Sequence, residues 1–176
     1  MLDISISYNR YKFLGHEFLT WLWYIIENDI ELINSLQQDP VSLVIGNRIV
    51  LENKVHDAVE SITIKGNDAG LEEGILSLKK GAVVTEINLS YKTGSQEWSF
   101  NIKGESLNIS SLKTPETGPI EKKQDIEGVV IEKIFLFEKI TKLIDSLYKE
   151  FIKKRVSNDW SKNIVPAIKK WISLNK

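Results

Sequence analysis

The chain has 176 residues, a formal net charge of −1 and no cysteine. This length is enough to bury a sizeable core, either as one domain or as a small domain with an appendage. The lack of cysteine excludes disulfides and thiolate metal sites. In the absence of an export signal it favours a cytoplasmic protein.

The first element is an unusually apolar run, FLTWLWYII, at residues 18–26. It is open to three explanations: a membrane anchor, a ligand site, or a helix that the rest of the chain buries. A spanning helix needs about 20 apolar residues, so this run is too short. Its spacing predicts a helix from residue 15 or 16 to 28, with one face made of Phe18, Leu22, Ile25 and Ile26. A helix that is apolar nearly all round is normally buried on several sides, which favours the third explanation.

Strand patterns follow a second short helix, predicted at residues 29–37. In SLVIGNRIVLE, Gly46-Asn47 separates two β-branched runs and predicts a hairpin. Residues 58–65 read as a further strand. Residues 71–81 read as a short helix closed by Gly81.

The clearest strands alternate apolar and polar residues. In the segment 83–91 one face is predicted to hold Val83, Thr85, Ile87, Leu89 and Tyr91. In the next strand Trp98, Phe100 and Ile102 point inward, and a shorter strand passes through Leu107 and Ile109. Such alternation indicates an antiparallel sheet that is wet on one face and packed on the other.

The C-terminal part is helical. One helix is predicted over residues 126–156, with a heptad seam at Phe137, Ile140, Ile144, Leu147 and Phe151. Such a helix is about 45 Å long. It therefore spans the body, projects as an arm, or pairs with another chain. A last helix at 159–174 contains Pro166, which kinks it or belongs to its first turns.

These elements predict an α+β fold. We expect an antiparallel sheet, or sheets, of about six strands packed on the apolar N-terminal helix and on a long C-terminal helix followed by a shorter one. The predicted units are an α+β body at 1–115, a linker at 116–125 and a helical segment at 126–176 packed on the body.

Residues suited to catalysis are few. His16 and His56 lack a nucleophile, metal-ligand spacing or a phosphate loop, so no catalytic residue, metal or cofactor is predicted. Glu17 either caps the first turn of the apolar helix or is a buried acid at a site. The acids Asp125, Glu127 and Glu132 are explained by the dipole at a helix N-terminus.

The charge is unevenly distributed along the chain. Residues 1–120 carry 10 Lys and Arg against 16 Asp and Glu, whereas residues 121–176 carry 13 against 8. A basic C-terminal third suits an anionic partner such as DNA, or simply forms a solvated helix surface. The candidate phosphate-binding residues are Lys153, Lys154, Arg155, Lys162, Lys169 and Lys170.

Three segments resemble divergent members of the recombination-associated protein RdgC family. The first is FLGHEFLTWLW, where the similar residues are Phe13, Leu14, Gly15, Glu17, Phe18, Leu19, Trp21, Leu22 and Trp23. The second, at 80–113, is matched at Lys80, Gly81, Val83, Val84, Thr85, Leu89, Leu107, Leu112 and Lys113. The third runs from Leu143 to Ile172 and is similar to the family's long helix and Trp-bearing tail. The similarity corresponds to the C-terminal part of the family.

The resemblance implies a nucleoid-associated protein that binds DNA with little sequence preference and restrains RecA-type recombinase. Family members form a ring-shaped dimer around duplex DNA and also carry an exonuclease label. We therefore expect a non-enzymatic DNA-binding accessory protein. The alternatives are an interaction module that forms a homodimer through the 126–156 helix and, third, a metal-dependent exonuclease. No small-molecule substrate or membrane contact is predicted.

Overall fold

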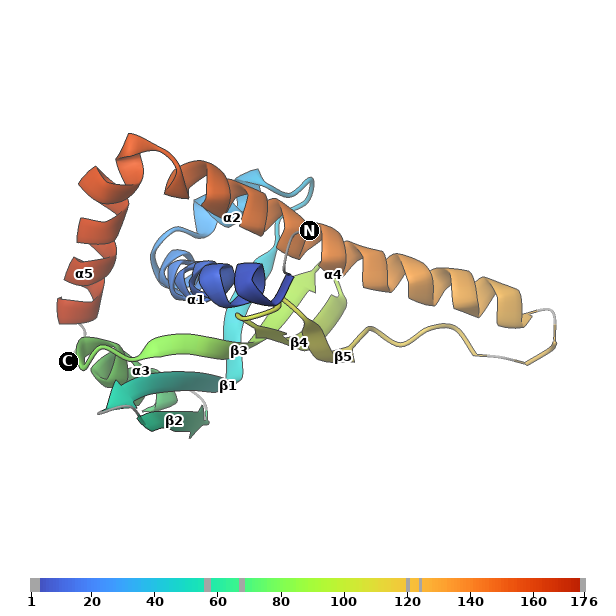
Figure 1. Cartoon of the computed structure of the whole chain (residues 1–176). Coiled ribbons are helices and arrows are strands. Elements are labelled where there is room, and N and C mark those ends of the chain that lie inside the picture. The colour runs from blue at the N-terminus through green and yellow to red at the C-terminus, as the bar shows by residue number, and fades with distance from the viewer. Residues whose placement is uncertain (1–3, 56–57, 67–68, 120, 124, 175–176) are drawn as a thin grey trace.

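The computed structural model describes residues 4–55, 58–66, 69–119, 121–123 and 125–174 (Figure 1). Its helices are α1 (Ile4–Asn28), α2 (Ile30–Ser35), α3 (Ala69–Lys79), α4 (Asp125–Arg155), the π-helical turn η1 (Trp160–Ile164) and α5 (Val165–Leu174). Its strands are β1 (Ser42–Val55), β2 (Ala58–Lys65), β3 (Val83–Thr93), β4 (Gln96–Lys103) and β5 (Ile109–Lys113).

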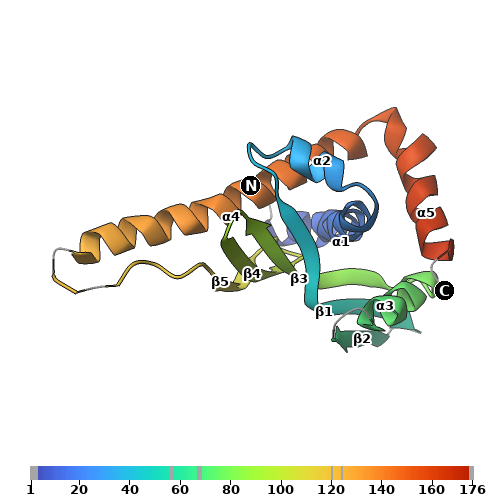
Figure 2. The ribbon, with the colours of Figure 1, turned by 180° about the vertical axis from the view of Figure 1, so that it is seen from behind.

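The five strands form one antiparallel sheet in the order β2-β1-β3-β4-β5 (Figure 2). The predicted α+β class and antiparallel sheet are confirmed, with five strands in place of about six. The inward residues of β4 alternate as expected, and Trp98, Phe100 and Ile102 are fully buried. Ion pairs such as Arg48–Glu86, at 2.7 Å, join β1 to β3 across the sheet.

The hairpin predicted at Gly46-Asn47 is wrong, because β1 runs through these residues as a single strand. The pairing of β1 with β3 shifts between Ile45 and Ile49, so two extra residues bulge from β1. The Asn88 side chain fills the bulge. Its Oδ1 accepts the Asn47 N–H at 3.2 Å, and a Cβ on Gly46 would collide with that same oxygen. Glycine is needed here for a close approach within a strand, not for a turn.

A second bulge, near the start of β3, changes the face of the sheet to which the first residues of this strand point. The pairing of β3 with β1 shifts between Val50 and Leu51 of β1, and Leu51 pairs with Val84. As a result Val84 is fully buried, whereas Val83 is 41% exposed, contrary to the predicted inward position of Val83. A bulge flips side chains that precede it to the opposite face, which strict alternation cannot reveal. The predicted β5 also starts late, at Ile109, because Leu107 adopts a φ of 54°.

The helix α1 lies between the sheet and α4 (Figure 1). It begins at Ile4, well before the predicted start at residue 15 or 16. Its apolar face joins a continuous core with the sheet, α4 and α5, as the burial interpretation predicted. Within the described ranges, no helix is long and apolar enough to cross a membrane.

The helix α4 has the predicted limits to within one residue, and its two halves differ. From Leu136 to Phe151 it packs on α1 and the sheet, and Leu136 O accepts the Trp98 Nε1–H at 3.2 Å. Its first turns extend beyond the body beside the 114–119 segment (Figures 1 and 2). Pro166 lies in the first turn of α5, just after the widened turn η1, in agreement with one of the two predicted positions.

Two helical glycines make a matched pair for a stability test. A Cβ on Gly15 would overlap the Gly104 carbonyl oxygen, whereas a Cβ on Gly128 would meet nothing within 4 Å. We expect Gly15→Ala to lower the free energy of unfolding by about 1–3 kcal/mol through overpacking. Gly128→Ala should raise it by about 0.5–1 kcal/mol through helix propensity. Urea unfolding measures both, and equal effects would contradict the α1–Gly104 contact.

Candidate functional site

The tryptophan-rich part of α1 is a buried scaffold. Fully or almost fully buried residues of the family-like signature are Phe18, Leu19, Trp21, Leu22 and Trp23, whereas Phe13 remains exposed. Trp21 lies 5.6 Å from Phe151 of α4, and Trp23 meets Trp171 of α5 edge-on at 5.5 Å. Phe18 meets Tyr148 of α4 edge-on, and burial raises the pKa of that tyrosine. These side chains hold α4 and α5 on α1.

Glu17 forms an ion pair that joins α1 to the end of α4. Its Oε2 accepts from Arg155 Nε at 2.7 Å, and the two side chains are 36% and 33% exposed. The capping interpretation of Glu17 is wrong, because α1 starts thirteen residues earlier, at Ile4. The Arg155 guanidinium also lies 5.5 Å from the centre of the Trp160 ring. Arg155 therefore fixes the corner where α4 turns into η1.

The six candidate phosphate-binding residues have different surroundings. Arg155 is engaged by Glu17, and Lys153 lies 3.4 Å from the Glu150 carboxylate. For the other four, no ion pair or hydrogen bond of the side chain occurs within the described residues: Lys154, Lys162, Lys169 and Lys170. Of the six predicted residues, two are thus held in contacts within the chain, and four have no side-chain partner among the described residues.

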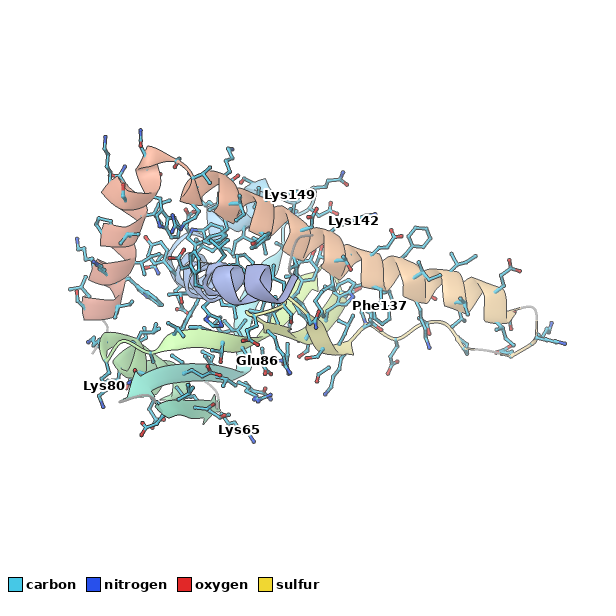
Figure 3. The ribbon with its side chains drawn as sticks, viewed as in Figure 1. Lys65, Lys80, Glu86, Phe137, Lys142 and Lys149 are labelled. Atoms are coloured by element: carbon cyan, nitrogen blue, oxygen red, sulfur yellow. The ribbon has the colours of Figure 1, made fainter. Side chains whose placement is uncertain are left out.

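The first turns of α4 expose a large apolar surface. We call residues 125–137 the projecting half of α4. Its exposed large hydrophobic side chains are Ile126, Val130, Ile131, Ile134, Phe135 and Phe137. Phe135 is 65% and Phe137 is 53% exposed. Figure 3 shows side chains standing out from this half into open space, whereas the other half of the helix covers the core.

Only one side of the projecting half is covered by its own chain. Val129 is buried there, and the Gly118 N–H donates to the Glu132 carboxylate at 3.4 Å, which ties the 114–119 segment to the helix. Phe137 belongs to the predicted heptad seam but differs from the other four members, which are buried. The helix leaves the body at this point, and Leu136, whose carbonyl oxygen accepts the Trp98 Nε1–H, lies at the limit of the part that the sheet covers.

The sequence does contain a signal for this surface. The runs Val129-Val130-Ile131 and Ile134-Phe135-Leu136-Phe137 place apolar residues on more than one face of a helix. A single core can cover only one such face unless the helix is enclosed.

The described part of the chain offers few residues for metal binding or acid–base catalysis. No group of three His, Asp or Glu side chains there is placed to hold a metal ion. The predicted acids at the start of α4 act on the backbone, because Asp125 Oδ2 accepts the Lys122 N–H at 2.7 Å. His56 lies outside the described residues, and His16 lies within α1.

Comparison with protein-family models, curated proteins and solved structures found no match to this chain. The resemblance to the RdgC family therefore stays a prediction.

The Glu17–Arg155 pair is open to a double-mutant test. We expect a coupling of about 0.2–1 kcal/mol between Glu17→Gln and Arg155→Met, because both side chains are partly exposed and screened by water. The fully helical pair Glu138–Lys142, at 2.9 Å, is the control and should couple by about 0.5 kcal/mol or less. Urea unfolding at low and high salt measures both. Zero coupling for Glu17 and Arg155 would contradict their role at the corner.

Proposed function

We propose that the protein is an interaction module that pairs with a second copy through the projecting half of α4. The observation that carries the proposal is the exposure of six large hydrophobic side chains on thirteen residues of helix. Four of them, Ile126, Val130, Ile134 and Phe137, share one side of the helix, and monomers rarely expose contiguous apolar patches larger than a few hundred Å². Surfaces of this kind mark sites of association.

The heptad seam predicted for dimerisation is not this surface. Ile140, Ile144 and Phe151 are buried in the chain's own core. The available stripe is Ile126, Val130, Ile134 and Phe137, spaced by four, four and three residues and therefore on one side of the helix. The dimer contact is accordingly shifted to the N-terminal end of the predicted 126–156 segment.

The spacing of the stripe is self-complementary. When two copies cross antiparallel, Ile126 of one lies near Phe137 of the other, and Val130 lies near Ile134. Such a two-fold arrangement uses the same patch on both copies and closes after two, which is the commonest form of oligomer. The stripe spans about 18 Å of helix, so the contact is small beside the roughly 800 Å² per partner of a standard interface.

A charge placed in the stripe tests the pairing. We expect the wild-type chain to sediment as a dimer at micromolar concentration, and Ile134→Glu to weaken dimerisation at least tenfold, because it would bury an unpaired carboxylate. Val44→Glu is the control, since Val44 is exposed to a similar degree on β1 and should leave the dimer unchanged. A wild-type monomer at 100 µM would exclude the proposal.

The absence of cysteine allows the direction of pairing to be tested as part of the same proposal. A mixture of Ile126→Cys and Phe137→Cys chains should form a disulfide between unlike chains on mild oxidation, and each variant alone should form far less. The geometric limit of about 7 Å between Cα atoms makes this pattern specific to antiparallel crossing. Efficient cross-linking of each variant with itself would indicate parallel pairing.

DNA binding is a second candidate, supported by a different observation. Lys154, Lys162 and Lys170 are free of ion pairs within the described residues and lie at the end of α4, in η1 and in α5, respectively. The 121–176 region carries a net charge of +5 in total. Phosphate contacts need only such cations, and the resemblance to the RdgC family implies binding of this kind without sequence preference.

A mobility-shift titration tests this second candidate. We expect binding to duplex DNA that weakens steeply between 50 and 200 mM salt, and about a tenfold loss on combined Lys154→Glu, Lys162→Glu and Lys170→Glu. The control combines Lys142→Glu and Lys149→Glu, whose cations already face Glu138 and Asp145 on the outer side of α4 (Figure 3). Binding that is absent, or insensitive to salt, removes DNA as a ligand.

A further inference from the structure

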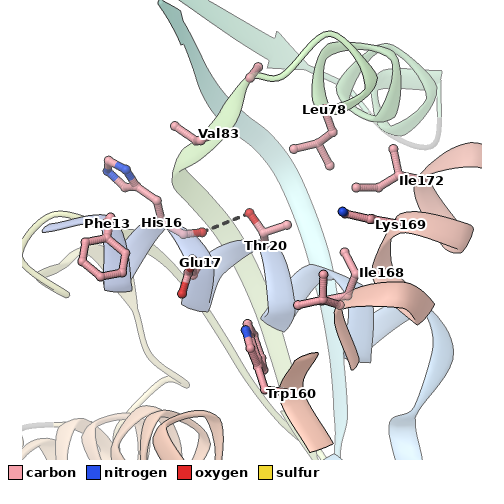
Figure 4. A pocket seen from close by; sticks show the side chains of 12 residues that line it. Phe13, His16, Glu17, Thr20, Leu78, Val83, Trp160, Ile168, Lys169 and Ile172 are labelled. Atoms are coloured by element: carbon pink, nitrogen blue, oxygen red, sulfur yellow. Dashed lines mark hydrogen bonds between the residues drawn. The ribbon is translucent and has the colours of Figure 1, made fainter. Parts of the chain in front are cut away.

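A cavity lies where α1, the end of α3, the start of β3, η1 and α5 meet (Figure 4). Its volume is about 410 Å³, within the range of small-molecule sites in proteins. Most of the wall is aliphatic, from Leu78, Ala82, Val83, Val165, Ile168 and Ile172. Trp160 and Phe13 also line it. An apolar cavity with a few polar groups is the usual form of a ligand site.

Two of its polar side chains are already engaged. The Thr20 hydroxyl donates to the His16 carbonyl oxygen at 3.0 Å (Figure 4), and the Glu17 carboxylate accepts from Arg155 at 2.7 Å. Neither group requires a ligand.

Lys169 is different. Its ammonium group points between Ile168 and Ile172 toward the cavity (Figure 4). Among the described residues it has neither an ion pair nor a hydrogen bond. A single cation at the mouth of an aliphatic cavity complements an anionic group at the end of an apolar chain.

The charges around the cavity restrict that anion further. Glu17 and Arg155 neutralise one another, so Lys169 leaves about one unit of positive charge. A dianion such as a phosphate monoester would face the Glu17 carboxylate with only one cation to balance it. A carboxylate carries one charge and suits a single ammonium.

We propose that this cavity binds an aliphatic monocarboxylate, with its chain against Leu78, Ile168 and Ile172 and its carboxylate on Lys169. This site is independent of the pairing surface on α4. Chains of about eight to twelve carbons suit a cavity of this size. Affinity should rise about two- to fourfold per methylene until the cavity is full, as expected for burial of apolar surface.

Calorimetry with the full chain tests the site, using decanoate, decanol and decylamine below their aggregation thresholds. We expect decanoate to bind one to one with a dissociation constant below about 1 mM, and decanol and decylamine to bind at least about threefold more weakly. Lys169→Met should weaken decanoate about fivefold and leave decanol unchanged. Lys170→Met is the matched control, because the neighbouring lysine does not line the cavity.

A second pair of variants tests the location. Val83→Trp places a large ring at the cavity wall from a partly exposed position and should abolish binding of both decanoate and decanol. Val59→Trp on β2 is the control and should bind as the wild type does. Both replaced residues are exposed, so the variants are expected to fold, which circular dichroism verifies.

Methyl NMR separates the cavity from the apolar surface of α4. Decanoate should shift the methyl resonances of Ile168 and Ile172 and leave that of Ile134 in place. The proposal is overturned by shifts at Ile134 instead, by binding that survives Val83→Trp, by equal affinity for decanoate and decylamine, or by no heat of binding at 1 mM decanoate.

Discussion

The packing of the tryptophan-rich helix α1 is the constraint on which the rest of the structure depends. Its apolar side chains cover more than one side of the helix, so a single layer cannot bury them. The sheet covers one side, Phe151 of α4 approaches Phe18 and Trp21, and Trp171 of α5 meets Trp23. The C-terminal helices must therefore return to α1. The cluster also explains why α4 turns sharply at Arg155, where Glu17 and Trp160 hold the corner.

The two halves of α4 follow from this constraint. The core needs the turns from Leu136 to Phe151, and Trp98 marks the limit of the sheet by its hydrogen bond to the Leu136 carbonyl. Within the described residues, the 114–119 segment covers one side of residues 125–135. These turns are no less apolar than the buried ones. Exposed apolar turns of this kind support the proposed use outside the core.

Local sequence patterns predicted the limits of the helices and strands better than they predicted the contacts between these elements. The limits of α4 and the inward face of β4 follow from periodicity within one segment. The bulge at Gly46 depends on Asn88, which is forty-two residues away in the sequence, and no local pattern contains it. The same holds for Phe137, whose exposure depends on where the sheet stops. The cavity beside Lys169 is lined by five elements, so the sequence alone did not indicate it.

The charged residues show the same difference between what the composition predicts and what the structure shows. The cations of the C-terminal third look alike in the sequence, but their environments differ. Arg155 spans Glu17 and Trp160, Lys153 faces Glu150, and Lys169 points to an aliphatic cavity. Only charged side chains that lack a partner within the protein contribute fully to the charge that a binding partner meets at the surface. Among the described residues of the C-terminal third, fewer lysines and arginines lack a partner than the residue count suggests. The exposed apolar side chains of α4 are more numerous than the predicted heptad seam indicated. We therefore favour association through the apolar helix over attraction of phosphate as the proposed function.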